Sequence, residues 1–337
     1  MTDPDLQNKP RHAADSTLVI VVPHPAETPL KYILIILGIM LWIAIAVSLI
    51  GAIYAVFLGL FFFMAHIALI TQLRGSAIKL GPNQLPELYH RVATLAQRVG
   101  LKETPQIYLK ESGGDLNAFA TKFFGTHFVV LYADLVAACG NNKEALDFII
   151  AHELGHLHRK HLRWRWLTIP ALFIPFLGSA YSRACEYTCD QYGYLVGNRP
   201  DKGLDGLYLL AAGPAQAATI NRAAFGAQVG DLNSVWMRLG QWMGSHPPIV
   251  KRLRRLDPSL APEHKDAFIP GIIAAIIAMT FAIAPIGAVG YFVKMTVERK
   301  LAHNMPHNST EDFAEPDVME PPEDSMSQQS FPQERPK

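Results

Sequence analysis

The strongest chemical signal in the sequence is His152-Glu153-Leu154-Gly155-His156. Residues four apart lie on one face of an α-helix, so both imidazoles can bind a single Zn²⁺ ion. Glu153 then points toward the coordination position that remains open for water. There Glu153 can accept the proton of a zinc-activated water and pass it to a leaving amine. The pattern predicts zinc-dependent peptide hydrolysis; the alternative is a charged helix surface with incidental histidines.

A second group of ligand-type residues follows at Cys185-Glu186-Tyr187-Thr188-Cys189-Asp190. On a helix, Glu186 and Asp190 share a face, so Glu186 can supply a third ligand for the zinc ion. Asp190 can accept a hydrogen bond from the distal nitrogen of a ligating histidine. The sequence thus predicts one Zn²⁺ per chain, held by residues from two helices.

One other arrangement competes for the same metal, and two further histidines are set aside. Cys185 and Cys189 are also four apart, and with the two histidines they would form a closed structural site, in which Glu153 would have no task. His158 and His161 lie off the ligand face of a continuous helix. They are therefore predicted to be surface or membrane-interface residues.

The helices and strands that must position these residues form a mixed domain over 75–265. Apolar residues at core-facing spacing precede His152 in a predicted helix over 143–163, which Asn141 or Asn142 can cap. Glu186 falls in a second predicted helix, over 184–196. Further helices are predicted at 86–99, 220–229 and 248–256, and strands at 106–109, 117–120 and 127–131.

Composition favours a membrane protein. Of the 337 residues 18% are charged and 50% are hydrophobic, and the formal net charge is +1. This excludes a wholly disordered chain and a nucleic-acid binder driven by bulk positive charge, so no nucleic-acid partner is predicted. Three cysteines do not make a disulfide framework and favour a reducing environment or a buried role. Nothing in the sequence indicates an oligomeric state.

The missing charges leave long apolar runs. Residues 32–73 contain no Asp, Glu, Lys or Arg, and as one helix they would measure about 63 Å, roughly twice a hydrocarbon core. They predict a transmembrane hairpin over 31–73, with spans near 32–50 and 54–73. A second run predicts a third span over 267–293, with the lipid bilayer as partner. Residues 1–30 are expected to be a flexible tail, and 301–337 a disordered acidic one.

The ordered set of motifs resembles the membrane-bound zinc metallopeptidases that include HtpX and the CAAX prenyl proteases. The likeness extends over most of 75–256. The motifs that carry it are Asn117-Ala118-Phe119-Ala120, the strand at 127–131, the approach to the zinc helix at 144–151, the His-Glu-Leu-Gly-His itself, Ser182-Arg183 with Glu186 and Asp190, and Ser245-His246-Pro247-Pro248 with Arg252 and Leu256.

The resemblance implies roles for these motifs. Glu186 is the third zinc ligand, Asp190 is the hydrogen-bond partner behind it, and Asn117–Ala120 is an edge strand that pairs with an extended substrate; the alternative for 117–120 is an ordinary strand and turn. His246 is expected near the metal, or simply beside a helix cap, and Arg252 in a structural or transition-state-stabilising role. The implied fold is α+β and predominantly helical, a membrane-anchored gluzincin-type catalytic domain with a small sheet and about three transmembrane helices.

The sequence departs from the family pattern in two places. Cys185 and Cys189 stand where the family has an arginine and a small residue. In addition, only 17 uncharged residues, 166–182, separate the zinc helix from the third ligand, where HtpX-like enzymes have two spans. One crossing would put Glu186 on the other side of the membrane from His152, and two crossings do not fit. We therefore predict a re-entrant or interfacial segment over 164–182, anchored by Trp164 and Trp166; the alternative is a buried soluble helix pair.

Flanking basic residues predict the orientation of the catalytic domain. Two spans before it leave the N-terminus and the domain on one side, where positive charges gather near the membrane. The residues concerned are Arg74, Lys79, Lys251, Arg252, Arg254, Arg255 and Lys265. They favour a cytoplasmic active site, and the expected location is a bacterial inner membrane.

The functional prediction is a zinc-dependent integral membrane endopeptidase that hydrolyses peptide bonds of membrane or misfolded proteins. The quality-control role comes from the resemblance alone. Two alternatives stay open: a non-proteolytic membrane scaffold or chaperone stapled by zinc, and a processing protease for lipidated peptides.

Overall fold

The computed structural model describes residues 18–197, 199–260 and 268–303. The first seventeen residues of the predicted N-terminal tail, and the predicted acidic tail from residue 304 onward, lie outside the described residues. The chain divides into two compact units, Met1–Pro285 and Ile286–Lys337. The catalytic-type residues all belong to the first unit.

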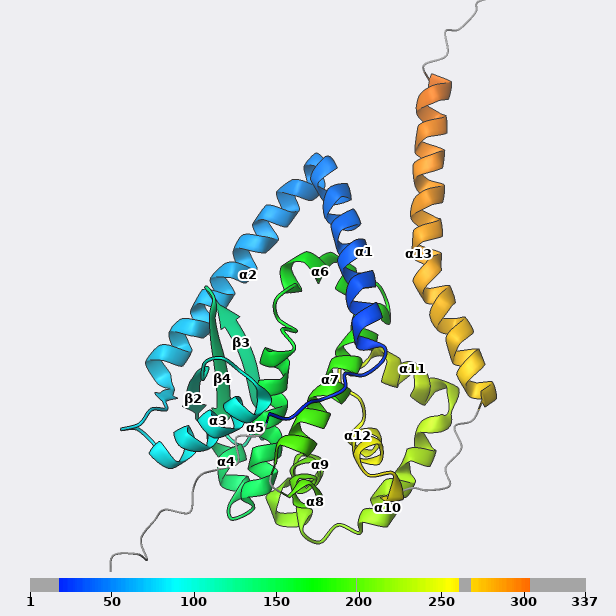
Figure 1. The fold of residues 1–337 in the computed structure, drawn as a ribbon. Coiled ribbons are helices and arrows are strands. Elements are labelled where there is room, and N and C mark those ends of the chain that lie inside the picture. Colours follow the sequence, from blue (N-terminus) through cyan, green and yellow to red (C-terminus); the bar gives the residue numbers. More distant parts are fainter. Residues whose placement is uncertain (1–17, 198, 261–267, 304–337) are drawn as a thin grey trace, which may run out of the picture. The chain divides into compact units, whose positions relative to one another are not determined.

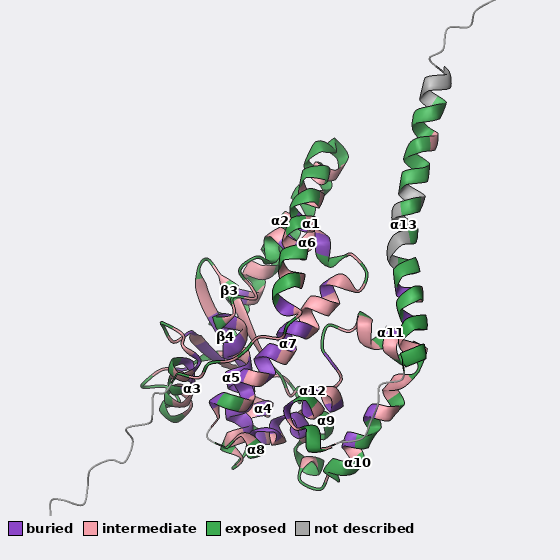
Figure 2. Ribbon diagram, turned by 45° about the vertical axis from the view of Figure 1, so that its right-hand side comes forward, coloured by how far each residue is buried: buried purple, intermediate pink, exposed green. Residues whose placement is uncertain are grey.

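Two long apolar helices come first, α1 (Glu27–Val47) and α2 (Leu49–Ser76). They contain 21 and 28 residues, long enough and apolar enough to cross a membrane. Only 11% and 6% of their most apolar stretches are buried, which distinguishes them from the core helices of a soluble protein (Figure 2). The chain turns at Ser48, whose hydroxyl accepts a hydrogen bond from the Gly51 N–H. The hairpin follows the predicted pattern, but α1 begins at Glu27, five residues before the predicted span.

The sheet is small and mixed, with strand order β1-β2-β4-β3. Its strands are β1 (Ile78–Lys79), β2 (Gln106–Lys110), β3 (Ala118–Phe123) and β4 (Thr126–Tyr132). Strands β2 and β4 run parallel, whereas β1 and β3 pair antiparallel with their neighbours. Among the described strands β3 is an edge, the position that the family resemblance implied for 117–120, although the strand begins only at Ala118.

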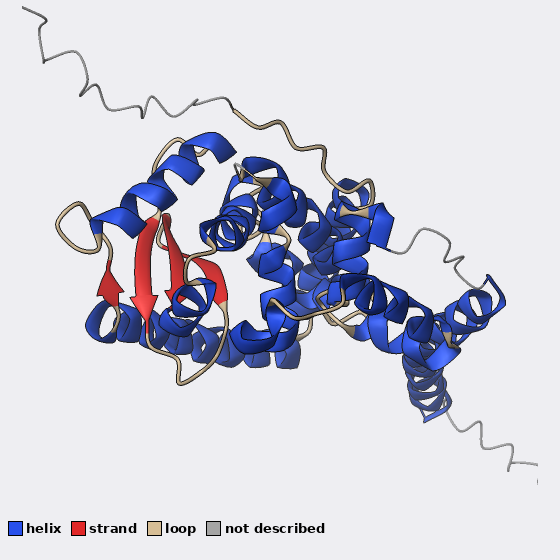
Figure 3. Cartoon of the chain, turned by 90° about the horizontal axis from the view of Figure 1, so that it is seen from below, coloured by secondary structure: helices blue, strands red, loops and turns tan. Residues whose placement is uncertain are grey.

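Strand β4 is buried on both faces because helices cover the sheet from two sides (Figure 3). Val129 and Leu131 face α3 (Pro86–Val99) and α5 (Lys143–His158). Phe128 and Val130 face the end of α2. All four side chains are fully buried, and successive residues of a strand point to opposite faces, so one strand serves two cores.

Helices α5 and α7 (Leu177–Val196) lie side by side in the centre of the domain (Figure 1). Asn142 caps α5, its side chain accepting the Ala145 N–H at 3.0 Å. Glycine permits the close approach of the two helices, since a Cβ at Gly193 would lie 2.8 Å from the carbonyl oxygen of Phe148. This pairing brings the two predicted groups of ligands together.

The apolar segment between α5 and α7 turns back toward the ligand helices. It forms α6 (Arg165–Leu172), which contains Pro170, and α7 starts a few residues later. Helix α6 packs along α1: the Trp42 indole N–H donates to the carbonyl of Trp166 at 3.1 Å, and Gly38 lies against Leu167. An apolar segment therefore lies beside a candidate membrane helix halfway along its length.

Short helices complete the first unit. They are α4 (Ala133–Cys139), α8 (Pro200–Gly203), α9 (Asp205–Ala217), α10 (Arg222–Ala227), α11 (Val235–Met243) and α12 (Ile249–Leu256), with 3₁₀ turns η2 (Gln228–Asn233) and η3 (Pro258–Leu260). The helix predicted over 220–229 is shorter than expected and continues as η2.

Helix α13 (Phe268–His303) contains most of the predicted third span. Its apolar stretch Phe268–Phe281 is shorter than those of α1 and α2, so the third crossing stays a prediction.

Candidate metal centre

Three of the predicted ligands meet at one point. The ligand atoms of His152, His156 and Glu186 lie within 4.8 Å of one another. The Nε2 atom of each histidine is 3.4 Å from a carboxylate oxygen of Glu186. His152 and Glu186 are buried, and His156 is partly exposed. Two imidazole nitrogens and one carboxylate are a donor set that suits zinc, with room for a fourth ligand on the exposed side.

The predicted partner of the first histidine is also in place. Asp190 Oδ1 lies 3.0 Å from His152 Nδ1, the ring nitrogen that faces away from Glu186. Asp190 is held in turn by Arg252, whose Nε donates to Oδ2 at 2.9 Å and whose Nη2 donates to Oδ1. The carboxylate therefore fixes the orientation of the His152 ring.

The charges of this cluster need a further cation. Glu186 and Asp190 carry two negative charges in a buried place, and Arg252 supplies one positive charge. Burial alone would lower the pKa of His152, but the charges of Glu186 and Asp190 raise it to about 10. In the metal-free protein the missing charge is thus a proton on His152. A divalent ion can replace that proton, so the donor set and its charge both fit zinc.

Glu153 lies beside the ligands, at the edge of the sheet. The backbone N–H of Ala120 in β3 donates to its carboxylate, and burial raises the pKa of Glu153 above its ordinary value. The Glu153 carboxylate thus lies between helix α5, which carries the residue, and the edge strand β3, where a general base for peptide hydrolysis would be needed.

An open cavity of about 550 Å³ gives access to the ligands. Asn117, Ala118, Phe119 and Ala120 line one side of it, and Thr168 and Leu172 of α6 line another. The predicted edge strand and the predicted membrane-proximal segment therefore both border the ligand cluster.

His246 lies at the mouth of this cavity. Its Nε2 is 3.5 Å from Glu186 Oε1, although two thirds of the side chain is exposed. Arg183 holds the preceding loop by donating to the carbonyls of Trp242 and Gly244 at 2.6 and 2.7 Å. His246 therefore lies beside the candidate ligand Glu186, and its placement near a bound metal, which the resemblance implied, stays a prediction.

Arg252 requires a correction. The sequence analysis counted it among the basic residues that flank the membrane, but its side chain is buried and bound to Asp190. It lies beside the candidate ligands, bound to Asp190; the structural or transition-state-stabilising role that the resemblance implied stays a prediction. Lys265, another of those flanking residues, lies outside the described residues.

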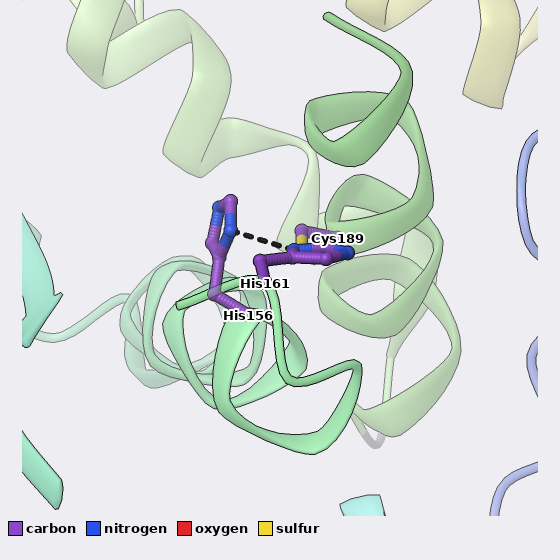
Figure 4. A group of neighbouring side chains, drawn as sticks. All are labelled: His156, His161 and Cys189. Atoms are coloured by element: carbon purple, nitrogen blue, oxygen red, sulfur yellow. Dashed lines mark hydrogen bonds between the residues drawn. The ribbon is translucent and has the colours of Figure 1, made fainter. Parts of the chain in front are cut away.

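A second group that could hold a metal contains His156, His161 and Cys189 (Figure 4). The prediction that His161 is a surface residue is wrong, since its side chain is only 6% exposed. Helix α5 ends at His158 and Lys160 adopts a left-handed conformation with φ of 58°, which folds His161 back toward His156. A helical-wheel argument cannot anticipate this turn, because it assumes a continuous helix to 163. His158 is exposed, as expected.

The closed two-His, two-Cys site is not assembled in the part of the chain that the structure describes. Cys185 belongs to neither group of possible ligands, and burial raises its pKa to about 12. Burial likewise raises the pKa of Cys189 well above its ordinary value. The structure favours the arrangement with Glu186.

Glu27 is one residue of this region that no sequence pattern indicated. It is the first residue of α1 and is 1% exposed. Its carboxylate accepts hydrogen bonds from Arg159 Nε and Nη2 at 3.0 and 2.8 Å and from the Thr188 hydroxyl. An acidic residue in the first turn of a helix is ordinary, so no signal in the sequence separates it from a simple helix-end charge.

Comparison with known proteins agrees with this geometry. The sequence profile of peptidase family M48 matches residues 82–173 and 166–259, together just over half of the chain. One curated relative is the plastoglobule-localized metallopeptidase 48 of Arabidopsis thaliana chloroplasts, 28% identical over 208 residues. The alignment covers 54% of this chain and 59% of the relative. No solved structure matches the chain.

Proposed function

Because this chain belongs to peptidase family M48, we propose that it is a zinc-dependent endopeptidase that hydrolyses peptide bonds of membrane or misfolded proteins at a membrane surface. Membership of the family implies a metallopeptidase. The observation that carries the finer proposal is the convergence of His152, His156 and Glu186, with Glu153 between them and an open strand edge.

In this proposal each residue of the site has its own role in hydrolysis. A zinc ion held by the two histidines and Glu186 would supply Lewis-acid chemistry to the scissile carbonyl and to a water molecule. Glu153 accepts the proton of the attacking water and donates it to the leaving amine. Asp190 and Arg252 keep the His152 ring in one orientation, so that the ligand does not have to reorganise during the reaction.

The edge strand β3 positions the substrate in this proposal. Strand β4 occupies one side of β3, and the other side borders the cavity. An extended peptide can pair with this edge through backbone hydrogen bonds, which select a conformation and not a sequence. That property suits an enzyme whose substrates are unfolded segments of many proteins.

The apolar helices support a membrane location. We place α1 and α2 across the bilayer and α6 beside α1 as the predicted re-entrant segment. The exposed Trp164 and Trp166 at the start of α6 suit the membrane interface. Because α6 also lines the cavity, the site would lie against the membrane surface and meet segments that emerge from it. The proposed compartment is a bacterial inner membrane with the site on the cytoplasmic side.

Cleavage of casein, an unfolded protein, by the detergent-solubilised chain tests the proposal. We expect zinc-dependent cleavage that a chelator abolishes and zinc restores. Glu153→Gln should bind zinc with unchanged stoichiometry but lose activity by about 10²- to 10⁴-fold, because the general base is gone.

The outcomes separate the alternatives. Robust cleavage by Glu153→Gln would overturn the assignment of the base. Bound zinc without turnover in the unmodified chain would favour a zinc-stapled scaffold. Cleavage restricted to lipidated C-terminal peptides would favour a processing protease.

A further inference from the structure

Each metal-binding histidine has a second ring nitrogen that needs a partner. For His152 the partner is Asp190. For His156 it is His161, whose Nδ1 lies 3.0 Å from His156 Nδ1 (Figure 4). A ligating imidazole is oriented by whatever its distal nitrogen contacts, so the environment of His161 bears on the metal.

The contact of His161 continues to a buried carboxylate. His161 Nε2 lies 3.3 Å from Glu27 Oε1. Glu27 is itself fixed by the guanidinium of Arg159 and by the hydroxyl of Thr188. The negative charge of Glu27 is therefore paired with Arg159. The position of its carboxylate is set by three side chains, those of Arg159, Thr188 and His161.

The hydrogen-bonded series runs from His156 through His161 to Glu27. When His156 Nε2 binds a metal, only one arrangement of protons gives each contact in this series one donor and one acceptor. The Nδ1–H of His156 donates to Nδ1 of His161, and the Nε2–H of His161 donates to Glu27. Both rings are then neutral and the carboxylate is charged. Every polar atom between the metal and α1 has a partner of the right kind.

We propose that Glu27 and His161 are positioning residues for His156, and that the first turn of α1 thereby sets the orientation of the second zinc ligand. The inference rests on the proposed zinc site. It gives the two histidines of the motif matched supports: a carboxylate directly behind His152, and a carboxylate acting through a second imidazole behind His156.

The same three side chains do not make a good separate metal site. The Cys189 sulfur is 3.9 Å from His161 Nδ1, and that nitrogen already faces His156. A metal there would have to share the His156 ring with the first ion. The hydrogen-bonded series needs no such sharing.

Zinc affinity of the full chain in detergent tests the proposal, measured by competition with a chelating dye. We expect His161→Phe, which keeps a buried ring but removes both hydrogen bonds, to weaken zinc binding by about 10- to 100-fold. Glu27→Gln should weaken it by about tenfold. Cobalt-substituted protein should show a shifted visible spectrum in both variants, a change that lost stability alone does not produce.

Asp147→Asn is the matched control. Asp147 is also buried, lies on α5 itself and accepts from Arg91 at 2.6 Å; in the described part of the chain its ion pair is with Arg91 and not with a histidine. This variant should lower the thermal midpoint of the metal-free protein while zinc affinity and the cobalt spectrum stay unchanged.

Three results are decisive. Zinc binding by both His161→Phe and Glu27→Gln that equals the unmodified chain would overturn the inference and leave the proposed function standing. An equal loss of zinc affinity in Asp147→Asn would show that the losses in the other two variants come from lower general stability, and it would also overturn the inference. Failure of the unmodified chain to bind zinc would overturn the proposed function itself.

Discussion

At the scale of single residues, the ligand cluster is organised by charge. Glu186 and Asp190 are buried carboxylates, and among the described residues Arg252 is the arginine that pairs with them. Such a cluster is costly to bury unless a further positive charge completes it. The metal-free protein completes it with a proton on His152, and the metal-bound protein with the ion. The two states therefore respond differently to pH.

The pH dependence of stability follows from the raised pKa of His152. A histidine whose pKa rises from 6.5 to about 10 on folding stabilises the protein fully below pH 6.5, and this contribution is lost as pH rises toward 10. The thermal midpoint of chelator-treated protein should fall over that interval. Zinc-loaded protein should not show this fall, since its His152 is already neutral.

The control for this prediction is Glu186→Gln, which removes one of the two charges that raise the pKa. Its metal-free midpoint should still begin to fall near pH 6.5, but the fall should end at lower pH and be smaller in total, because the folded pKa of His152 is raised less. If the thermal midpoints of the metal-free and zinc-loaded proteins changed with pH in the same way, the proposed role of the His152 proton would be contradicted.

The residues that carried a local pattern could be predicted from the sequence, and those placed by tertiary contacts could not. The four-residue spacing of His152 and His156, and of Glu186 and Asp190, is enough to put each pair on one helix face. The structure brings these pairs together. His161 was misjudged because the left-handed Lys160 breaks the helix before it. Glu27 was overlooked because its partners lie more than 130 residues away in the sequence.

At the scale of elements, the site depends on how closely α5 and α7 approach. The ligands come from both helices, so any separation of the helices lengthens the distances from Glu186 to the two histidines. Gly155 and Gly193 lie at the contact, where a Cβ on either would come within about 3 Å of the other helix. The glycine of the His-Glu-Leu-Gly-His sequence thus has a packing role of its own.

Gly193→Ala should therefore impair both stability and metal binding. Overpacking of this kind costs about 1–3 kcal/mol of unfolding free energy. The matched control is Gly240→Ala in α11, where a Cβ meets nothing within 4 Å. It should be neutral or stabilising by up to about 1 kcal/mol, since alanine favours the helix. Thermal unfolding with and without zinc measures both, and equal effects of the two substitutions would contradict the packing argument.

Helices whose apolar residues recur at a regular helical spacing were the most predictable elements. The helix over Pro86–Val99 has its predicted ends, and Gly100 terminates it in a left-handed conformation with φ of 90°. The return of the chain through α6 followed from the requirement that Glu186 and His152 share a metal. Contact of α6 with α1 did not follow from the sequence, because nothing local records which apolar surfaces will meet.

At the scale of the whole molecule, the candidate membrane helices are part of the catalytic domain. Ile70 and Leu73 of α2 are buried against Tyr108, Phe128 and Val130 of the sheet. Removing α2 would expose this apolar face. We therefore expect that residues 75–260 do not form an independent folding unit.

A fragment of residues 75–260 tests this statement. We expect it to aggregate, or to bind a hydrophobic dye and unfold without a cooperative transition, because one face of its sheet is uncovered. Size-exclusion chromatography and thermal unfolding give the answer. A monomeric fragment with the same cooperative transition as the full chain would show that α2 contributes nothing to the domain.

The double burial of β4 also determines the order in which the enzyme can mature. Synthesis delivers α1 and α2 before any strand, and the strands then assemble on a surface that α2 provides. Until α2 and the strands have packed together, the scaffold that holds the ligand cluster is unfinished. In the proposed enzyme, hydrolysis would therefore have to wait for this packing.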